Sequence, residues 1–373
     1  MRHNPRRNKV TNLQLFSLVL NVMVATGVFT ISRTVGEVAG RGAILAIPLA
    51  GVLSLLQLLG MYLLGRRFPD QTLPEYAPEI LGRPLAVAYL LGYFLLNMAL
   101  AILVPRNFWL LLTAWIFRRT PPIAFFLPLA LVCWNIARRG VVVLSRVSEM
   151  LLMLTLPLLL LLLLPHDSVD LDFLRPPLDR GAWQIVKGVL PAYFSMIGFD
   201  IFLFVFPFTQ EKGALKAASL GMAAVTLFYT VSTLLVIGSL SLERTIISNW
   251  PLQTYVNNVA IGLFDRFDVI ILMVWTWQVI MTITIPMFTA AACLRGVFPR
   301  LNSRRAADIA LVVLLVALLA HVDLPRQMKA LGLYSYMSLI YVGSLPLLLW
   351  LIAVLRKKKG GSRDDQPVEQ QTA

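Results

Sequence analysis

One carboxylate lies in the middle of a long apolar stretch of this chain. Asp200 belongs to residues 183–208, two residues after Gly198 and near Ser195. An aspartate near the centre of a bilayer costs roughly 2.5–3.5 kcal/mol on insertion scales, so packing alone does not explain its presence. A membrane helix that is interrupted where a polar ligand binds would account for the carboxylate, the serine and the glycine together.

Motifs for other kinds of chemistry are missing from the sequence. It contains no HExxH, no GxSxG and no P-loop pattern. Its two cysteines, Cys133 and Cys293, lie in separate apolar segments without CxxC spacing, which is typical of small buried side chains. We therefore expect no enzyme activity, no metal site and no cofactor.

The composition indicates an integral membrane protein. Hydrophobic residues make up 58% of the chain and charged residues 14%, whereas soluble domains usually contain about 25% charged residues. Apolar windows of about 20 residues recur along the chain, and each is long enough to cross a bilayer. The net charge of +14 could suit nucleic acid, but Lys and Arg cluster in short loops between apolar segments. We expect contact with lipid and none with nucleic acid.

The hydropathy pattern predicts about ten membrane-spanning helices. The domain they form covers residues 13–357, between a basic N-terminus (1–12) and a disordered polar tail (358–373). The expected spans are 13–32, 43–64, 85–112, 122–137, 145–164, 183–208, 215–239, 268–293, 306–321 and 333–355.

The distribution of Lys and Arg predicts the orientation. With a cytoplasmic N-terminus, the inner loops and termini hold 21 of the 33 basic residues, which agrees with the positive-inside rule. An even number of spans then places the C-terminus in the cytoplasm as well. The acidic loop 165–182 would face outward.

Two glycine-marked breaks occupy corresponding positions in the two halves of the chain. Ala25, Thr26 and Gly27 interrupt span one, and the segment from Ser195 to Gly198 interrupts span six. Paired broken helices of this kind are typical of transporters built from inverted repeats, with the binding site near the midplane. The sequence therefore predicts an all-α fold with a 5+5 inverted repeat of the LeuT type.

The breaks suggest how a small zwitterion would bind. N–H groups at the half-helix that follows Gly27 suit a carboxylate, and carbonyl groups freed near Ser195 and Gly198 suit an ammonium group. Close packing of helices is the alternative explanation for both glycines. The candidate ligand-binding residues are Ala25, Thr26, Gly27, Val28, Asn97, Ser195, Gly198, Phe199, Asp200 and Gln278.

Asp200 and Asn97 each admit more than one role. Asp200 could bind the amine of the ligand, act as a gating or proton-linked group, or form an ion pair with Arg33, Arg106 or Lys187. Asn97 could line the cavity or join two helices.

Five segments form a recognisable set in order along the chain: Asn21-Val-Met-Val-Ala-Thr-Gly-Val-Phe-Thr-Ile-Ser-Arg33, Leu174-Arg-Pro-Pro177, Gly198-Phe-Asp200 with Phe206-Pro207, Trp250-Pro251, and Val274-Trp-Thr-Trp-Gln278. Together these segments resemble the spore germination permeases. These are the B subunits of germinant receptors, within the amino acid–polyamine–organocation superfamily, and the resemblance covers roughly residues 10 to 357. Ser32 stands where that family usually has proline, and Asp200 where glutamate is common.

The resemblance implies the fold of bacterial amino acid transporters. It also implies assembly with an A subunit and a lipoprotein C subunit in the spore inner membrane, and a role in sensing small nutrients, commonly amino acids. A working secondary carrier for amino acids or cations is the alternative, and a scaffold that binds no ligand is a third hypothesis. In related sodium-coupled carriers, hydroxyls of span eight hold an ion, although Thr282 and Thr284 could equally bond their own helix.

Overall fold

The chain is a bundle of helices in a computed structural model that describes residues 9–161, 169–257, 267–320 and 324–360. Within these ranges the only β pairing is an isolated parallel bridge between Val10 and Thr209. The α-helices are α1 (Asn12–Met23), α2 (Ile31–Ala39), α3 (Ala43–Arg67), α4 (Leu73–Leu81), α5 (Arg83–Trp115), α6 (Pro122–Ala137), α7 (Val141–Leu161), α8 (Ala182–Phe194), α9 (Phe202–Val205), α10 (Glu211–Ile247), α11 (Pro251–Asn257), α12 (Phe267–Val297), α13 (Ser303–Leu319), α14 (Leu324–Ser338) and α15 (Leu345–Leu355).

Short 3₁₀ turns and one π-helical stretch complete the structure. The 3₁₀ turns are η1 (Thr26–Phe29), η2 (Gly40–Gly42), η3 (Leu171–Leu174), η4 (Phe199–Ile201) and η5 (Phe206–Phe208), and the π-helical stretch η6 is Leu339–Ser344.

Each predicted span coincides with a helix or a broken helix over its described residues. The first span consists of α1, η1 and α2, and it continues to Ala39 rather than ending at residue 32. The sixth is α8 followed by residues 199–208, and the two parts meet at 55°. The short helices α4 and α11 lie in segments that the sequence pattern left as connections. Most of the predicted tail lies outside the described residues.

Length and composition alone identify fewer spans. By that test, five helical stretches among the described residues could cross a membrane, or six if the bent pair counts as one span. The apolar helices α1 and α6 are shorter than the test requires. Breaks inside a span explain part of the difference, because a broken helix presents two short pieces.

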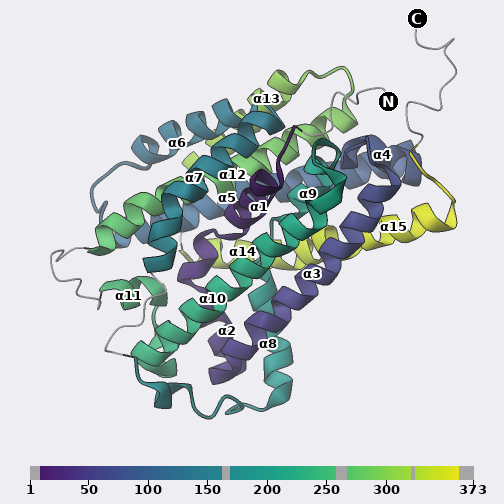
Figure 1. Ribbon diagram of the computed structural model, residues 1–373. Helices are drawn as coiled ribbons and strands as arrows, with labels where there is room; N and C mark the ends of the chain where they lie inside the picture. The colour runs from purple at the N-terminus through teal and green to yellow at the C-terminus, as the bar shows by residue number, and fades with distance from the viewer. Residues whose placement is uncertain (1–8, 162–168, 258–266, 321–323, 361–373) are drawn as a thin grey trace, which may run out of the picture.

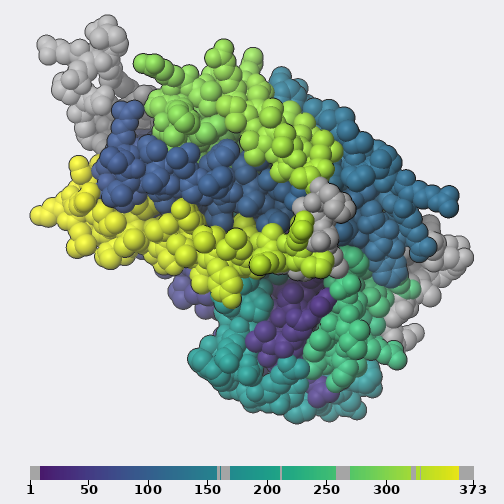
Figure 2. Space-filling view, turned by 180° about the vertical axis from the view of Figure 1, so that it is seen from behind, coloured from purple at the N-terminus to yellow at the C-terminus, as the bar shows by residue number. Residues whose placement is uncertain are grey.

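The helices pack as two groups (Figure 1). The core bundle consists of α1, α2, α3, α8 and α10, which contact one another closely. The scaffold consists of α5, α6, α12 and α13, and the pairing of α5 with α12 is its largest contact. Equivalent helices of the two halves thus lie in the same group, as an inverted repeat requires. Viewed from behind, α2 reaches the surface between α8 and α10 (Figure 2).

Both ends of the described chain lie at the same end of the core bundle. The N–H groups of Lys9 and Val10 donate to the Phe208 carbonyl, and the Gly360 N–H donates to the Arg67 carbonyl. Phe206 joins these two sites because its ring packs edge-on against Tyr62 of α3. The capping box of Thr11 and Gln14 then starts α1.

Close packing of α3 on α10 leads to a test of the core bundle. A Cβ at Gly51 would lie 2.5 Å from the Thr226 side chain, so Gly51→Leu overpacks this contact. We expect a loss of stability of about 1–3 kcal/mol, seen as a lower Tm of the purified protein in detergent. Val52→Leu is the matched control, because Val52 is 54% exposed on the outer face of the same helix and should leave Tm unchanged. Equal Tm values for the two variants would contradict the packing described.

Candidate ligand-binding site

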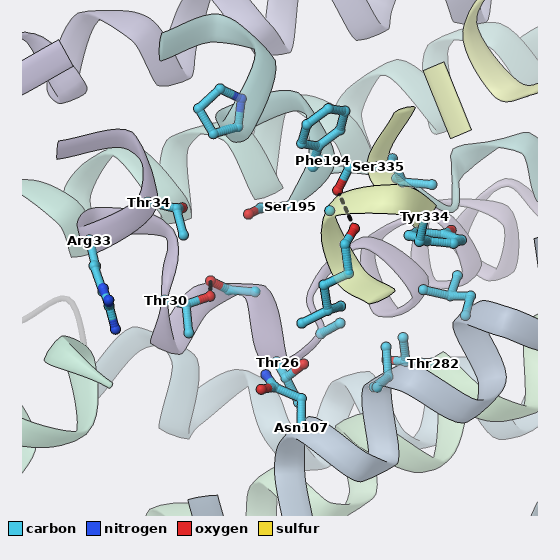
Figure 3. A pocket seen from close by; sticks show the side chains of 18 of the residues that line it. Thr26, Thr30, Arg33, Thr34, Asn107, Phe194, Ser195, Thr282, Tyr334 and Ser335 are labelled. Atoms are coloured by element: carbon cyan, nitrogen blue, oxygen red, sulfur yellow. Dashed lines mark hydrogen bonds between the residues drawn. The ribbon is translucent and has the colours of Figure 1, made fainter. Parts of the chain in front are cut away.

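A cavity of about 600 Å³ lies between the core bundle and the scaffold. The end of α1, the first break and α2 form one wall, and α8 with Ser195 and Ile197 forms another. Leu100, Val104 and Asn107 of α5 line it from the scaffold, and residues of α14 close a further side. Figure 3 shows the labelled side chains around this space.

The first break leaves backbone donors without partners beside the cavity. After α1 ends, the Ala25 N–H donates to the Met23 carbonyl, and the Thr30 N–H donates to the Gly27 carbonyl. The N–H groups of Thr26 and Gly27 donate to no group among the described residues. Free N–H groups in an apolar protein interior favour an anionic or polar partner.

The second break faces the first. A Cβ at Gly27 would lie 3.2 Å from Ser195 Cβ and 3.3 Å from Ser195 Oγ, so only a residue without a side chain leaves this space open. Gly198 has φ +120°, and a Cβ there would lie 2.6 Å from Val22 Cγ2. Each break therefore depends on a glycine that contacts the other broken helix.

Asp200 lies beyond the second break and does not line the cavity. Its side chain is 5% exposed, and Oδ2 accepts a hydrogen bond of 2.7 Å from the Tyr93 hydroxyl of α5. This bond joins the core bundle to the scaffold. Tyr93 packs against Tyr89, Phe204 and Tyr341, so aromatic rings surround the pair.

The three cations considered as ion-pair partners of Asp200 bind other groups. Arg33 donates to Glu37 and to Asn249, and Arg106 donates to the carbonyls of Ala317 and Ala320. Lys187 lies over the Trp183 ring. Among the described residues no salt bridge reaches Asp200, so the ion-pair hypothesis is not supported by this structure.

Asn97 and Gln278 join helices beside the cavity rather than lining it. The Asn97 amide donates to the Tyr93 carbonyl of its own helix and accepts from Thr289 of α12. Gln278 of α12 donates to the carbonyl and side chain of Asn21 on α1. Asn21 in turn donates to Ser148 of α7, so a buried polar network holds the end of α1.

The structure thus divides the predicted site residues. Ala25, Thr26, Gly27 and Ser195 line the cavity, whereas Val28, Asn97, Gly198, Phe199, Asp200 and Gln278 lie outside its lining. Sequence reasoning missed several lining residues, namely Thr30, Asn107, Tyr334 and Ser335. For Asn107 a signal existed, because it is a polar residue in an apolar span at helical spacing from Leu100 and Val104.

Polar residues surround the mouth of the cavity. Arg33 donates to Glu37 at 2.8 Å and to Asn249 at 2.7 Å, and Trp250 follows directly in the chain. Arg33 and Glu37 are half-exposed, in contrast to the buried residues at the breaks. The Trp250-Pro251 segment, quoted above as a family match, therefore lies at this entrance.

No group of three His, Cys, Asp or Glu suited to a metal ion occurs in the described part of the chain. The hydroxyl groups considered for sodium bind protein carbonyls. Thr282 donates to the carbonyls of Gln278 and Asn21, and Thr284 donates to that of Ile280.

Solved structures define the class of protein to which this fold belongs. The transporter Mhp1 of the nucleobase-cation-symport-1 family, solved with bromovinylhydantoin bound, has a TM-score of 0.65 and 13% identity, covering 97% of this chain and 82% of that one. MhsT in complex with L-phenylalanine has a TM-score of 0.62 and 13% identity, covering 92% and 98%. The chain is an all-α membrane protein with the LeuT fold that these transporters share.

Sequence comparisons then give the family. The family model described as "Spore germination protein" matches residues 9–323, and this chain belongs to that family. Spore germination protein YndE of Bacillus subtilis (strain 168) is 25% identical over 94% of this chain and 98% of that protein. Spore germination protein B2 of the same organism is 24% identical over 95% and 97%. The resemblance seen in the sequence motifs is confirmed.

Removing the Tyr93 hydroxyl tests the contact with Asp200. Tyr93→Phe leaves a buried carboxylate without its donor, which costs about 1–3 kcal/mol and should lower Tm in detergent. Tyr76→Phe is the matched control, because the buried Tyr76 hydroxyl has no hydrogen-bond partner in the described part of the chain and its removal should not lower Tm. If Tyr93→Phe is no less stable than Tyr76→Phe, the contact does not stabilise this conformation.

Proposed function

We propose that this chain is the transporter-like membrane subunit of a spore germinant receptor. It binds a small nutrient of the amino acid class between the two broken spans, and binding triggers germination. The observation that carries the proposal is the cavity at which both breaks meet, with unpaired N–H groups at Thr26 and Gly27 on one side.

The two breaks supply complementary polarity for a zwitterion. The N–H groups that precede α2 suit an α-carboxylate. The carbonyl end of α8 terminates at Phe194, and Ser195 places its hydroxyl in the same space, which suits an ammonium group (Figure 3). The carboxylate of one amino acid would thus bind span one and its ammonium group span six, and the ligand would fix the position of one span relative to the other.

The size and lining of the cavity fit a small ligand. Its volume of about 600 Å³ lies within the roughly 300–1,000 Å³ common for small-molecule sites. Apolar side chains such as Leu100, Val104 and Phe194 would surround the ligand side chain. Among the described lining residues the charged ones are Arg33 and Glu37, which pair with each other at the mouth.

Asp200 acts, in this proposal, as a gating group rather than as a ligand. Its hydrogen bond to Tyr93 joins the core bundle to the scaffold on the far side of the break from the cavity. A ligand that moves the second break would strain or release this bond. Differential binding to two such states is what a ligand-driven switch requires.

Membership of the family supports a proposal for the partner subunits and the membrane of this receptor. We propose assembly with the A subunit and the lipoprotein C subunit in the spore inner membrane, with both termini in the cytoplasm. The two ends of the described chain lie at the same end of the bundle, which agrees with this topology.

Gly27→Leu tests the site in spores. The new side chain would fill the space against Ser195, and we expect the germination response to amino acids to fall at least about tenfold, since a displaced ligand loses its polar contacts. The measurement is the fall in optical density of spores that carry the variant as the only copy, with membrane levels checked by immunoblot. Val52→Leu, on the outer face of α3, should respond normally. A normal response from Gly27→Leu at normal membrane levels rejects the site.

A working secondary carrier is the second candidate, and the transporter neighbours favour it. Uptake of labelled L-leucine into proteoliposomes that contain this chain alone distinguishes the two. The receptor proposal predicts binding without accumulation above empty liposomes, because its output passes through partner subunits. Saturable uptake that Gly27→Leu abolishes would favour the carrier.

A further inference from the structure

Asn107 is a buried polar residue that lines the cavity and has no partner in the described protein. Its side chain is 4% exposed, and its Oδ1 is buried without a hydrogen bond. A buried polar atom that lacks a partner costs about 1–3 kcal/mol, so a leucine of similar size would be more favourable for folding. A group that is costly for stability and faces a cavity is a candidate for ligand recognition.

The turn of α5 that carries Asn107 is fixed by bonds to two other helices. Gln327 of α14 donates to the Leu103 carbonyl at 2.9 Å, and Arg106 donates to the carbonyls at the end of α13. Neither bond uses the Asn107 amide. These bonds hold the backbone of this turn in place, which lowers the entropic cost of positioning Asn107 for a ligand.

Asn107 lies next to the unpaired donors of the first break. In Figure 3 its amide is beside Thr26, and α5 contacts η1 in the fold. Oδ1 is buried, whereas Nδ2 is not among the buried unpaired atoms and donates to no group in the described protein, so we take the amide nitrogen as the end that is open to the cavity. The N–H groups of Thr26 and Gly27 are donors as well, so three hydrogen-bond donors meet at one end of the cavity.

We infer that Asn107 Nδ2 binds the α-carboxylate of the amino acid together with the N–H groups of Thr26 and Gly27. This inference rests on the proposed function and adds a residue that determines ligand class. A set of neutral donors favours a carboxylate over the uncharged carboxamide, since hydrogen bonds to charged groups are stronger. The site should therefore prefer free amino acids to their amides, and to amines that lack the carboxylate.

The test compares ligand pairs on the purified full-length protein in detergent. Thermal shift titrations use L-valine, L-leucine and L-phenylalanine, and the carboxamide of each. We expect the wild type to prefer at least one of these free amino acids to its amide. In Asn107→Leu the apparent Kd for that amino acid should rise by about 10- to 100-fold, with little change for the amide. Tm without ligand should stay equal or increase.

Two further variants sharpen the result. Asn107→Asp places a carboxylate against that of the ligand, so it should also lose the amino acid but retain the carboxamide. Thr155→Val removes a buried hydroxyl that bonds its own helix outside the cavity lining, and it should leave the preference of the wild type unchanged.

Three other results would reject, in turn, the role of Asn107, the binding of a carboxylate and the proposed function. If Asn107→Leu keeps the wild-type preference for the free amino acid, or lowers Tm without ligand by several degrees, Asn107 is not the carboxylate-binding residue and the proposed function stands. If these three amino acids bind the wild type no better than their amides, the carboxylate inference also falls. If none of the twenty common L-amino acids shifts the wild-type Tm, the proposed amino acid receptor itself is rejected.

Discussion

Backbone polar groups released inside an apolar environment are the constraint on which this structure depends. Two spans break near the middle of the molecule, and each break frees groups that hydrocarbon cannot satisfy. Protein partners bind some of them, such as the Tyr229 hydroxyl that donates to the Met23 carbonyl. The N–H groups of Thr26 and Gly27, which have no partner among the residues that the structure describes, lie beside the cavity. The need for backbone partners thus links the broken helices of the fold directly to the cavity between them.

The remaining polar residues of the interior connect the two helix groups. Gln278 and Thr282 of α12 donate to the Asn21 carbonyl near the end of α1. The Tyr93 hydroxyl donates to Asp200 after the second break. Both contacts join the core bundle to the scaffold next to a broken helix. A movement of the core bundle against the scaffold would therefore break these hydrogen bonds and form others. Packed interfaces that exchange contacts in this way adopt discrete conformations rather than a continuous range.

Local sequence properties predicted the fold well. Apolar segments of about 20 residues marked the spans, and glycine with neighbouring small polar residues marked both breaks. Errors in the boundaries have a local cause. The first span continues to Ala39 because α2 resumes after the break. The last begins at Leu324, and it includes a polar residue, Gln327, because that side chain is buried and donates to the Leu103 carbonyl.

The sequence by itself determined the class of protein, the two breaks and four residues of the cavity lining, because hydropathy and glycine act through neighbouring positions in the chain. Only the tertiary structure decided the surroundings of Asp200 and Asn107. Asp200 is separated from Tyr93 by 107 positions, and its place outside the cavity depends on how α5 packs on the second break. Asn107 faces the cavity because of the rotation of α5, which contacts with α13 and α14 fix. The surroundings of Asp200 and Asn107 thus depend on contacts between segments that are far apart in the chain, and such contacts cannot be read from a single sequence.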